Sequence, residues 1–405
     1  MQVLPILSVL RRNKAGALLI GLQIALTLAI VCNCLSVIQQ YRAQMARPSG
    51  MNESDVFSVT NLWVGQPDDL KALTTADVRA LRAMPGVLDA ESTNGFPLGN
   101  SGFGTGISLK PDQRIPSASI AEYFVDEHGL TAYGVKLIAG RWFNNDEITD
   151  LQMGQDEAAP SVVITRSLAR TLFPSGNALG QTVYVNSHNP IRVIGIVEGA
   201  QSPWAGTTHE TSKAENSVFL PHRYAGTYAR YLIRTRPGAL GTTMAAVRDV
   251  LQRVTHRRIV LEVTAFPQTR QRAYQAEHSL SILLGGLCAL LMLVTACGIV
   301  GLVLYWVSQR RRQIGMRRAL GARRADIVRY FQLENLLIAG AGALLGVAIG
   351  LSGNTWLAKT LILSRMNPGF IIVAAVAVLA LSQIAVLWPA LRAARIPPAA
   401  AIRDL

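Results

Sequence analysis

The chain has 405 residues, of which 50% are apolar and only 16% are charged. A typical soluble protein has about a quarter of its residues charged, so this composition argues against a soluble protein. The net charge of +14 would suit a nucleic-acid-binding protein, and the position of the charges along the chain decides whether that class applies.

The positive charge is concentrated in three short stretches. Residues 39–279 are almost neutral, with 23 basic against 22 acidic side chains. The surplus comes from three basic residues before Ala15, eight between Ser308 and Tyr330, and three after Leu391. Each stretch borders a long apolar run, which is typical of a membrane protein that follows the positive-inside rule and excludes nucleic acid as a partner.

Four apolar runs predict four membrane-spanning helices, at residues 15–38, 280–307, 331–351 and 370–391. The third run is the weakest, because it contains Glu334 and Asn335. The alternative for that run is a buried helix of a soluble domain. The first run exceeds the usual 7–15 apolar residues of a signal peptide, so we interpret it as an uncleaved anchor. Cys32, Cys34, Cys288 and Cys297 all fall in these runs and are expected to be apolar packing residues.

Four spans with basic inner flanks place both termini in the cytoplasm. The predicted fold class is therefore an α-helical membrane protein with a large α+β domain between its first and second spans. We divide the chain into an N-terminal segment with the first span (1–38), an external domain with helical stalk segments (39–279) and a three-span region (280–405). A basic connection at 308–330 lies between the second and third spans.

The external segment shows alternating strand and helix patterns. A capping sequence at residues 74–77 predicts the start of a helix that ends at Pro85-Gly86. The glycine-rich residues 102–106 are expected to form a flexible loop, and residues 269–277 a polar helix that continues into the second span. Further strands are predicted at 56–63, 87–90, 161–164, 181–185, 191–197 and 259–264, helices at 166–172 and 239–254, and a turn at 186–190.

Known catalytic and nucleotide-binding patterns are absent from the sequence. A phosphate-binding loop needs a Gly-Lys pair, and the chain has none. Its six histidines lack the spacing of zinc ligands. Three acidic pairs, Asp126-Glu127, Asp146-Glu147 and Asp156-Glu157, are interpreted as charge on solvated loops. We therefore expect no catalytic, cofactor or metal site in this chain.

The basic connection contains apolar residues and glycines among its arginines. Ile314, Met316 and Leu320 stand amid charge, while Gly315 and Gly321 are expected to break or bend the helix. One interpretation is a segment held along the membrane by anionic lipid. The glycines and the embedded apolar residues favour the other, a docking element whose apolar tip enters a groove on a soluble partner.

The same segment resembles a family signature. Gln313-Ile314-Gly315-Met316-Arg317-Arg318-Ala319-Leu320-Gly321-Ala322 is similar to the Glu-Ile-Gly-x-x-[Arg/Lys]-Ala-[Leu/Ile/Val]-Gly-Ala motif of the MacB-like, FtsX-type permeases of ABC transporters. Residues 331–346 and the closing stretch 389–398 are similar to further parts of that family, as are residues 140–143, 162–180 and 191–197 to its periplasmic core domain. The resemblance covers nearly the whole chain in the right order.

The resemblance implies a permease in the bacterial inner membrane that couples ATP hydrolysis by a separate ATPase dimer to movement of its periplasmic domain, for export. ATP and magnesium would bind that partner. A second permease subunit, identical or related, is implied, together with a periplasmic adaptor and an outer-membrane channel. The implied contacts with the ATPase are Arg311, Gln313, Ile314, Gly315, Met316, Arg317, Arg318, Gly321 and Ala322.

The chain differs from the family in two respects. Gln313 stands where the family usually has glutamate, so an ion pair with the ATPase would become a neutral hydrogen bond. The sequence also lacks the fused nucleotide-binding domain of the macrolide exporter, which predicts the split arrangement with an ATPase on another polypeptide. Two other functions within the same four-helix plan are an FtsX-like relay that regulates a periplasmic enzyme and a permease that extracts lipoproteins.

Within the spans, a few residues stand out as contacts between helices. Gly342, Gly346 and Gly350 recur every four residues and predict a closely approaching helix, while Gln23 and Thr27 are expected to face protein. Glu334 is expected to pair with Arg329 or Arg324.

Overall fold

The structure, a computed structural model, describes residues 14–65, 69–152, 159–185, 189–204, 214–361 and 368–396. It consists of two compact units, a helical unit formed by Met1–Gln44 with Glu277–Leu405 and an α+β unit formed by Met45–Ala276. We call them the membrane unit and the core domain.

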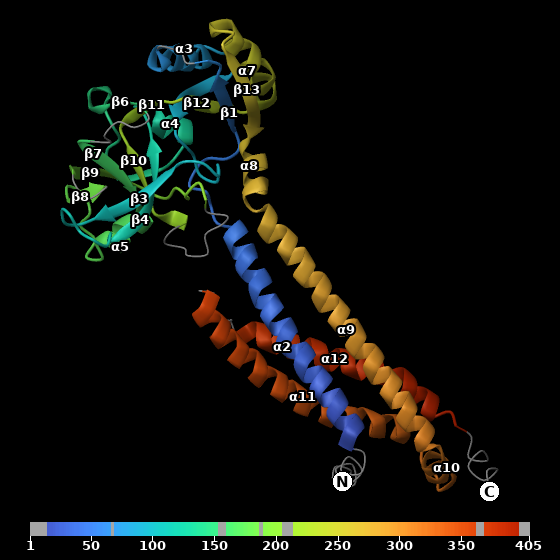
Figure 1. The fold of residues 1–405 in the computed structure, drawn as a ribbon. Coiled ribbons are helices and arrows are strands. Elements are labelled where there is room, and N and C mark those ends of the chain that lie inside the picture. Colours follow the sequence, from blue (N-terminus) through green and yellow to red (C-terminus); the bar gives the residue numbers. More distant parts are fainter. Residues whose placement is uncertain are drawn as a thin grey trace. The chain divides into compact units, whose positions relative to one another are not determined.

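Four helices of the described chain are long and apolar enough to cross a membrane, and each contains one of the four predicted spans. A short helix, α10, lies between the second and the third in the sequence (Figure 1). The helices are α2 (Lys14–Met45), α9 (Gln275–Gln309), α10 (Arg311–Ala319), α11 (Arg324–Leu361) and α12 (Pro368–Ala393).

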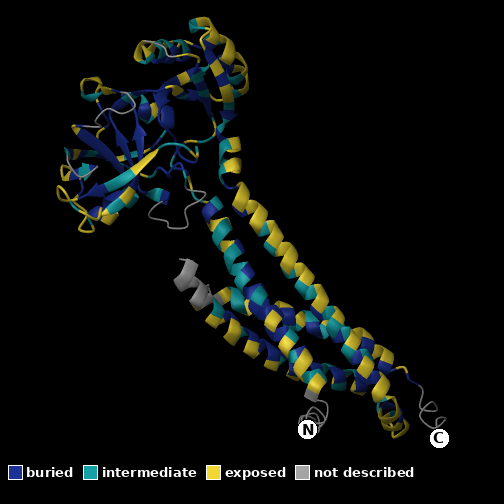
Figure 2. Cartoon of the chain, in the orientation of Figure 1, coloured by how far each residue is buried: buried dark blue, intermediate teal, exposed yellow. Residues whose placement is uncertain are grey.

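The membrane unit has one apolar core, to which all five helices of its described residues contribute. Fully buried side chains include Ile24 and Leu28 of α2, Ile299 of α9 and Val386 of α12. Leucines on the outer surfaces are exposed, as Figure 2 shows along α9. A large exposed apolar surface of this kind is typical of contact with a membrane or with another protein. The four cysteines of the chain lie in α2 and α9 as free thiols.

The described residues of the core domain form three sheets. Their strand orders are β13-β1-β12-β2, β5-β9-β7-β10-β4-β3-β8 and β11-β6, and the first sheet is antiparallel throughout. The strands are β1 (Val56–Trp63), β2 (Val87–Thr93), β3 (Phe103–Ser108), β4 (Ala118–Phe124), β5 (Leu137–Gly140), β6 (Thr149–Gln152), β7 (Ser161–Thr165), β8 (Thr182–Val185), β9 (Asn189–Val197), β10 (Ser217–Leu220), β11 (His222–Ala225), β12 (Tyr228–Thr235) and β13 (Arg258–Ala265).

Helices cover one face of the first sheet. Val59 on β1 packs with Leu81 of α3 and Leu251 of α7, and all three are buried. Fully burying such a side chain stabilises the fold by about 1.5–3 kcal/mol. The helices of the core domain are α3 (Leu70–Arg82), α4 (Gly129–Tyr133), α5 (Arg166–Leu172), α7 (Leu240–Val254) and α8 (Phe266–Ala273), with a 3-10 turn, η1, at Asn145–Glu147.

Helix α3 begins earlier than the sequence predicted. Its cap is Asp69, whose carboxylate accepts a hydrogen bond of 2.8 Å from the amide of Ala72. Thr74 and Asp77 therefore lie inside the helix and are buried. Asp77 is held there by a partner from β13, which a local capping pattern does not contain.

The glycine-rich residues 102–106 do not form the expected flexible loop, because Phe103–Ser108 is strand β3. The glycines are required by close packing. A Cβ atom at Gly106 would lie 2.3 Å from Cγ of Pro116, and one at Gly104 would lie 3.2 Å from the indole of Trp204. Glycine thus marks close approach within a strand here.

The prediction of a continuous helix from residue 269 into the second span is also wrong. Helix α8 ends at Ala273, Tyr274 has φ −110° and ψ 16°, and α9 begins at Gln275. The hydroxyl of Tyr274 bonds to Oε1 of Gln201 at 2.9 Å, which fixes this residue to the core domain. The predicted turn at 186–190 lies partly outside the described residues, and its last two residues belong to β9.

A buried ion pair joins α3 to the edge strand β13. The guanidinium of Arg258 donates to both carboxylate oxygens of Asp77 at 2.7 Å, and both side chains are fully buried. Tyr231 donates a further hydrogen bond to Asp77, and the indole of Trp63 lies 4.5 Å from the guanidinium carbon. This geometry satisfies both charges within the protein.

Replacement of Arg258 by methionine is expected to lower the free energy of unfolding by about 3–5 kcal/mol, because it leaves the Asp77 carboxylate buried without its partner. The double variant Asp77→Leu/Arg258→Met should regain most of that loss. Both are measured by chemical denaturation. A single variant as stable as the parent would show that the pair is not the contact that holds β13.

Candidate functional site

The candidate site is the connection between α9 and α11, which contains α10. This helix ends where Gly321 adopts φ +98°, and the amide of Ala322 bonds to the carbonyl of Arg317 at 3.1 Å. Gly321 therefore terminates the helix. Gly315, by contrast, lies inside α10 and is buried, so the expected break at this residue does not occur.

Only part of the predicted apolar tip is exposed. Ile314 is 5% exposed and belongs to the core of the membrane unit. Met316 and Leu320 are 56% and 88% exposed. The docking hypothesis therefore needs a correction, because Ile314 fastens α10 to its own protein while Met316 and Leu320 remain available for contact.

Three arginines tie the connection to the helices around it. Arg310 donates from Nη1 to both oxygens of Glu334 at 3.0 Å, and Glu334 is 1% exposed. The expected partners Arg329 and Arg324 are thus replaced by Arg310, which directly follows α9, caps the start of α10 and reaches across to α11.

The other two arginines lie within α10. The guanidinium of Arg317 lies 4.9 Å from the ring of Tyr330 on α11. Arg318 donates to the carbonyl of Ile396, which follows α12. Together with Arg310–Glu334, these contacts link the short helix and its start to α11 and to the residues that follow α12.

The remaining predicted coupling residues form the exposed part of the connection. Arg311, Gln313, Arg317 and Gly321 are exposed, and Arg318 and Ala322 are half-buried. The structure thus presents cationic, amide and apolar groups together on one short helix and its cap. Such a mixed surface suits contact with another protein, in which a few apolar anchors stand among charges.

The predicted packing residues lie at the contacts of α2. A Cβ atom at Gly342 would be 2.6 Å from the carbonyl oxygen of Gly21, and one at Gly346 would be 2.7 Å from that of Ala25. Gly350 is less crowded, at 3.5 Å from Cα of Ala29. Backbones approach closely because these positions have no side chain.

On another side of α2, polar groups contact α9. The amide of Gln23 donates to the carbonyl of Val294 at 3.2 Å, and the hydroxyls of Thr27 and Thr295 are 2.8 Å apart. These contacts place both side chains against protein rather than lipid. They also satisfy polar atoms that would be costly to leave unpaired in hydrocarbon.

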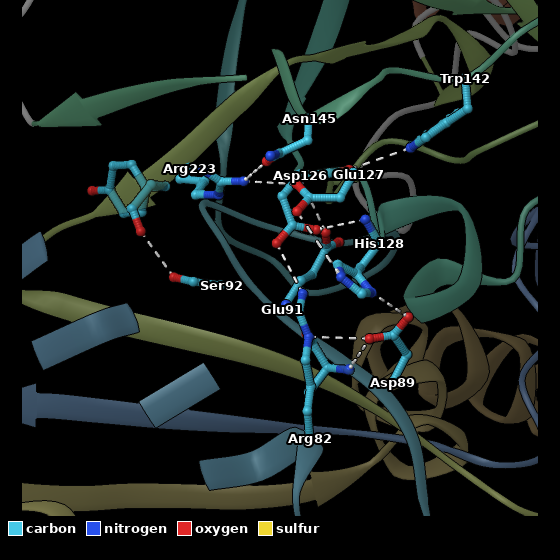
Figure 3. A network of polar contacts seen from close by, with 12 residues as sticks. Arg82, Asp89, Glu91, Ser92, Asp126, Glu127, His128, Trp142, Asn145 and Arg223 are labelled. Atoms are coloured by element: carbon cyan, nitrogen blue, oxygen red, sulfur yellow. Dashed lines mark hydrogen bonds and ion pairs between the residues drawn. The ribbon is translucent and has the colours of Figure 1, made fainter. Parts of the chain in front are cut away.

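A polar network inside the core domain was missed by the sequence analysis (Figure 3). Arg82 of α3 donates to Asp126 at 2.9 Å and lies 3.2 Å from Asp89 of β2. Arg223 of β11 bonds to Glu127 at 2.8 Å. The members lie far apart in sequence, so no local spacing signals them.

The acidic pairs accordingly differ from the predicted solvated loops. Asp126 is 7% exposed and forms an ion pair. The carboxylate oxygens of Glu147 accept hydrogen bonds from Nη1 and Nη2 of Arg141, at 2.6 and 2.8 Å. Asp146 is exposed as expected, and Asp156-Glu157 lies outside the described residues. Within the described part of the chain, no group of three or more His, Cys, Asp or Glu residues is arranged to hold a metal ion.

Glu91 is the most deeply buried acid of this network. Its Oε2 accepts from the amide of Asp126 at 3.4 Å, and its Oε1 has no hydrogen-bond partner among the described residues. Burial raises the pKa of Glu91 well above its ordinary range, and the negative charge of Asp126 raises it further. The folded domain therefore favours the protonated acid.

A raised pKa in the folded state destabilises that state as the pH rises. Below the unfolded pKa of about 4.3, Glu91 is protonated in both states and has no effect; the penalty grows as the pH rises toward the folded pKa. Glu91→Gln should therefore gain stability over the parent with increasing pH. Chemical denaturation from pH 5 to 9 measures this, with Asp146→Asn as the exposed-acid control. A pH-independent difference would mean that Glu91 does not titrate in this window.

Comparison with known proteins agrees with this architecture. The model of the MacB-like periplasmic core domain matches residues 18–254, and that of the FtsX-like permease C-terminal domain matches residues 285–398. A macrolide export ATP-binding/permease protein MacB 1/2 of Paracoccus denitrificans is 28% identical over 84% of this chain and 49% of its own length.

Two further proteins show similarity. A pyoverdine export ATP-binding/permease protein PvdT of Pseudomonas syringae is 26% identical over 68% of this chain and 42% of its own length. The crystal structure of the periplasmic region of MacB from Actinobacillus actinomycetemcomitans is 16% identical, with a TM-score of 0.33, over 57% of this chain and 97% of that one. The chain spans about half the length of the curated relatives it matches.

Four helices suited to crossing a membrane, with an α+β domain between the first two, define a multi-pass membrane protein of the permease type. The chain belongs to the family of MacB-like, FtsX-type ABC transporter permeases, since the core-domain model alone matches more than half of it.

Proposed function

We propose that the chain is the permease subunit of an export system in the bacterial inner membrane, driven by ATP hydrolysis on a separate ATPase dimer. The anchored helix α10 carries this proposal, because Met316 and Leu320 are exposed on an element whose other contacts fix it to the membrane unit. Relatives named for macrolide and pyoverdine export support export as the activity.

The proposed working cycle follows from the contacts of α10. Closure of the ATPase dimer would push on Met316 and Leu320, and the Arg310–Glu334 pair would carry the displacement to α11. A second permease subunit would complete the assembly, and an adaptor protein with an outer-membrane channel would receive the exported compound. In this scheme the chain supplies mechanical coupling, and its partner supplies nucleotide chemistry.

The exposed apolar residues of α10 provide the test. Met316→Asp and Leu320→Asp should each weaken co-purification of the ATPase by about tenfold or more, because a charge replaces an apolar anchor. Stimulation of ATP hydrolysis by the permease should fall in parallel. Leu88→Asp, at a leucine of the core domain that is 54% exposed, is the matched control.

Unchanged binding and stimulation in both α10 variants would refute the docking assignment. ATP hydrolysis by the purified chain alone would contradict the proposal of a separate ATPase. Ile314 is unsuitable as a docking probe, since its burial predicts loss of folding on substitution by aspartate.

The proposed orientation predicts labelling on opposite sides of the membrane. In a background without the four native cysteines, Thr171→Cys in the core domain should react with a membrane-impermeant maleimide added to spheroplasts. Arg317→Cys should react only after the membrane is opened. Both positions are exposed in the structure, so accessibility depends on the side of the membrane alone. Labelling of both cysteines from the same side would overturn the topology.

A further inference from the structure

The face of the first core-domain sheet opposite α3 and α7 contains a cleft of about 460 Å³. This volume lies in the range of small-molecule sites. Thr60, Arg230 and Glu262 form one row of its floor, because Thr60 of β1 is in register with both of the others. Phe96, Trp204 and Arg272 contribute to its walls.

Arg230 is a half-buried cation in this cleft that forms no hydrogen bond or ion pair with a carboxylate of the described residues, although the charge of Glu262 acts on it. Its Nη1 donates long hydrogen bonds to the carbonyls of Asn94, at 3.3 Å, and Ser101, at 3.5 Å. Its guanidinium carbon lies 6.0 Å from the centre of the Phe96 ring. Burial lowers the pKa of Arg230, which reflects the cost of removing this charge from water.

The acid closest in register to Arg230 already has a partner. Glu262 pairs with Arg272 of α8, and this ion pair lowers the pKa of the Glu262 carboxyl. The three ionised groups therefore leave one positive charge in the cleft. The guanidinium of Arg230 has donor groups left for further hydrogen bonds, and a guanidinium prefers carboxylate, sulfonate or phosphate oxygens as acceptors.

Beside the charged row lies an apolar one. Leu62 is in register with Tyr228 on one side and with Ile259 on the other. Tyr228 and Ile259 are 59% and 50% exposed, although both lie within a sheet. Rows of the same face are two residues apart along a strand, which is about 6.8 Å. A bound molecule of that length would reach from Arg230 to the apolar row.

We propose that Arg230 of this cleft and the exposed apolar row beside the cleft together bind an amphipathic organic anion, with its acidic group on Arg230 and its apolar body over Leu62, Tyr228 and Ile259. The inference deepens the proposed function, on which it rests for the role of the ligand, because it names the class of compound that is exported. Neither a neutral apolar molecule nor a small inorganic anion would use both rows.

The test uses the full chain in lipid nanodiscs, with 2-naphthoate as the probe and 2-naphthalenemethanol as a neutral probe with the same rings. Binding is measured by equilibrium dialysis against empty nanodiscs, without ATPase or nucleotide. Naphthoate should bind saturably and at least tenfold more tightly than the alcohol. Arg230→Gln should remove that preference, and Arg230→Lys should retain part of it.

Two further variants distinguish the contribution of the Arg230 charge to binding from that of the apolar row and from the effect of losing any arginine. Tyr228→Ser should weaken both probes, because both use the apolar row. Arg236→Gln, at an exposed arginine just beyond the end of β12, should leave both unchanged. Thermal unfolding verifies that each variant is folded, and if Arg230→Gln is not, Arg230→Lys and Tyr228→Ser decide.

Equal affinity of the parent for the two probes, or tight naphthoate binding that survives both Arg230→Gln and Tyr228→Ser, would overturn the proposal. These outcomes leave the coupling through α10 untouched. Loss of ATPase stimulation in the α10 variants is measured separately, so failure of the cleft and failure of the export function are distinguishable.

Discussion

The ion pair between Arg310 and Glu334 is the contact on which the arrangement of the membrane unit's connecting segment depends. Glu334 is nearly inaccessible and lies at the start of the apolar stretch of α11, so its charge requires a partner. Arg310 supplies that partner from the end of α9. The pair thereby sets where α9 ends relative to α11, and α10 must fit in the short interval between them.

This constraint explains why some residues of α10 are buried against the membrane unit while others are exposed. Ile314 and Gly315 face inward because the helix is held close to the core, and Met316 and Leu320 are left outside. An amphipathic pattern alone does not distinguish these apolar residues. Which of them is buried depends on the face of α10 that packs against the core of the membrane unit.

The sequence predicted the large-scale organisation well because the membrane imposes a strong and simple requirement. Long uncharged runs and basic flanks locate α2, α9, α11 and α12. Partial alternation, a short apolar run and a Pro-Ser-Gly stop locate β1, β7 and α5 with their observed limits or nearly so. The errors have particular causes. Asp77 and Asp126 were misjudged because their partners are remote in sequence, and β3 because its glycines meet Pro116 and Trp204 across the fold. The open cleft at Arg230 likewise depends on strand register, which no local pattern contains.

The glycine contacts between α2 and α11 fix the position of α11, and the position of α11 in turn affects the connecting segment. Gly346 is twelve residues from Glu334 on the same helix, about 18 Å along its axis. An added methyl group at Gly346 would collide with the backbone of Ala25 and push α11 aside. Since Glu334 lies on the same helix, a displacement of α11 would move the anchor of Arg310 as well. One carbon atom in this membrane-spanning helix would thus change the orientation of α10.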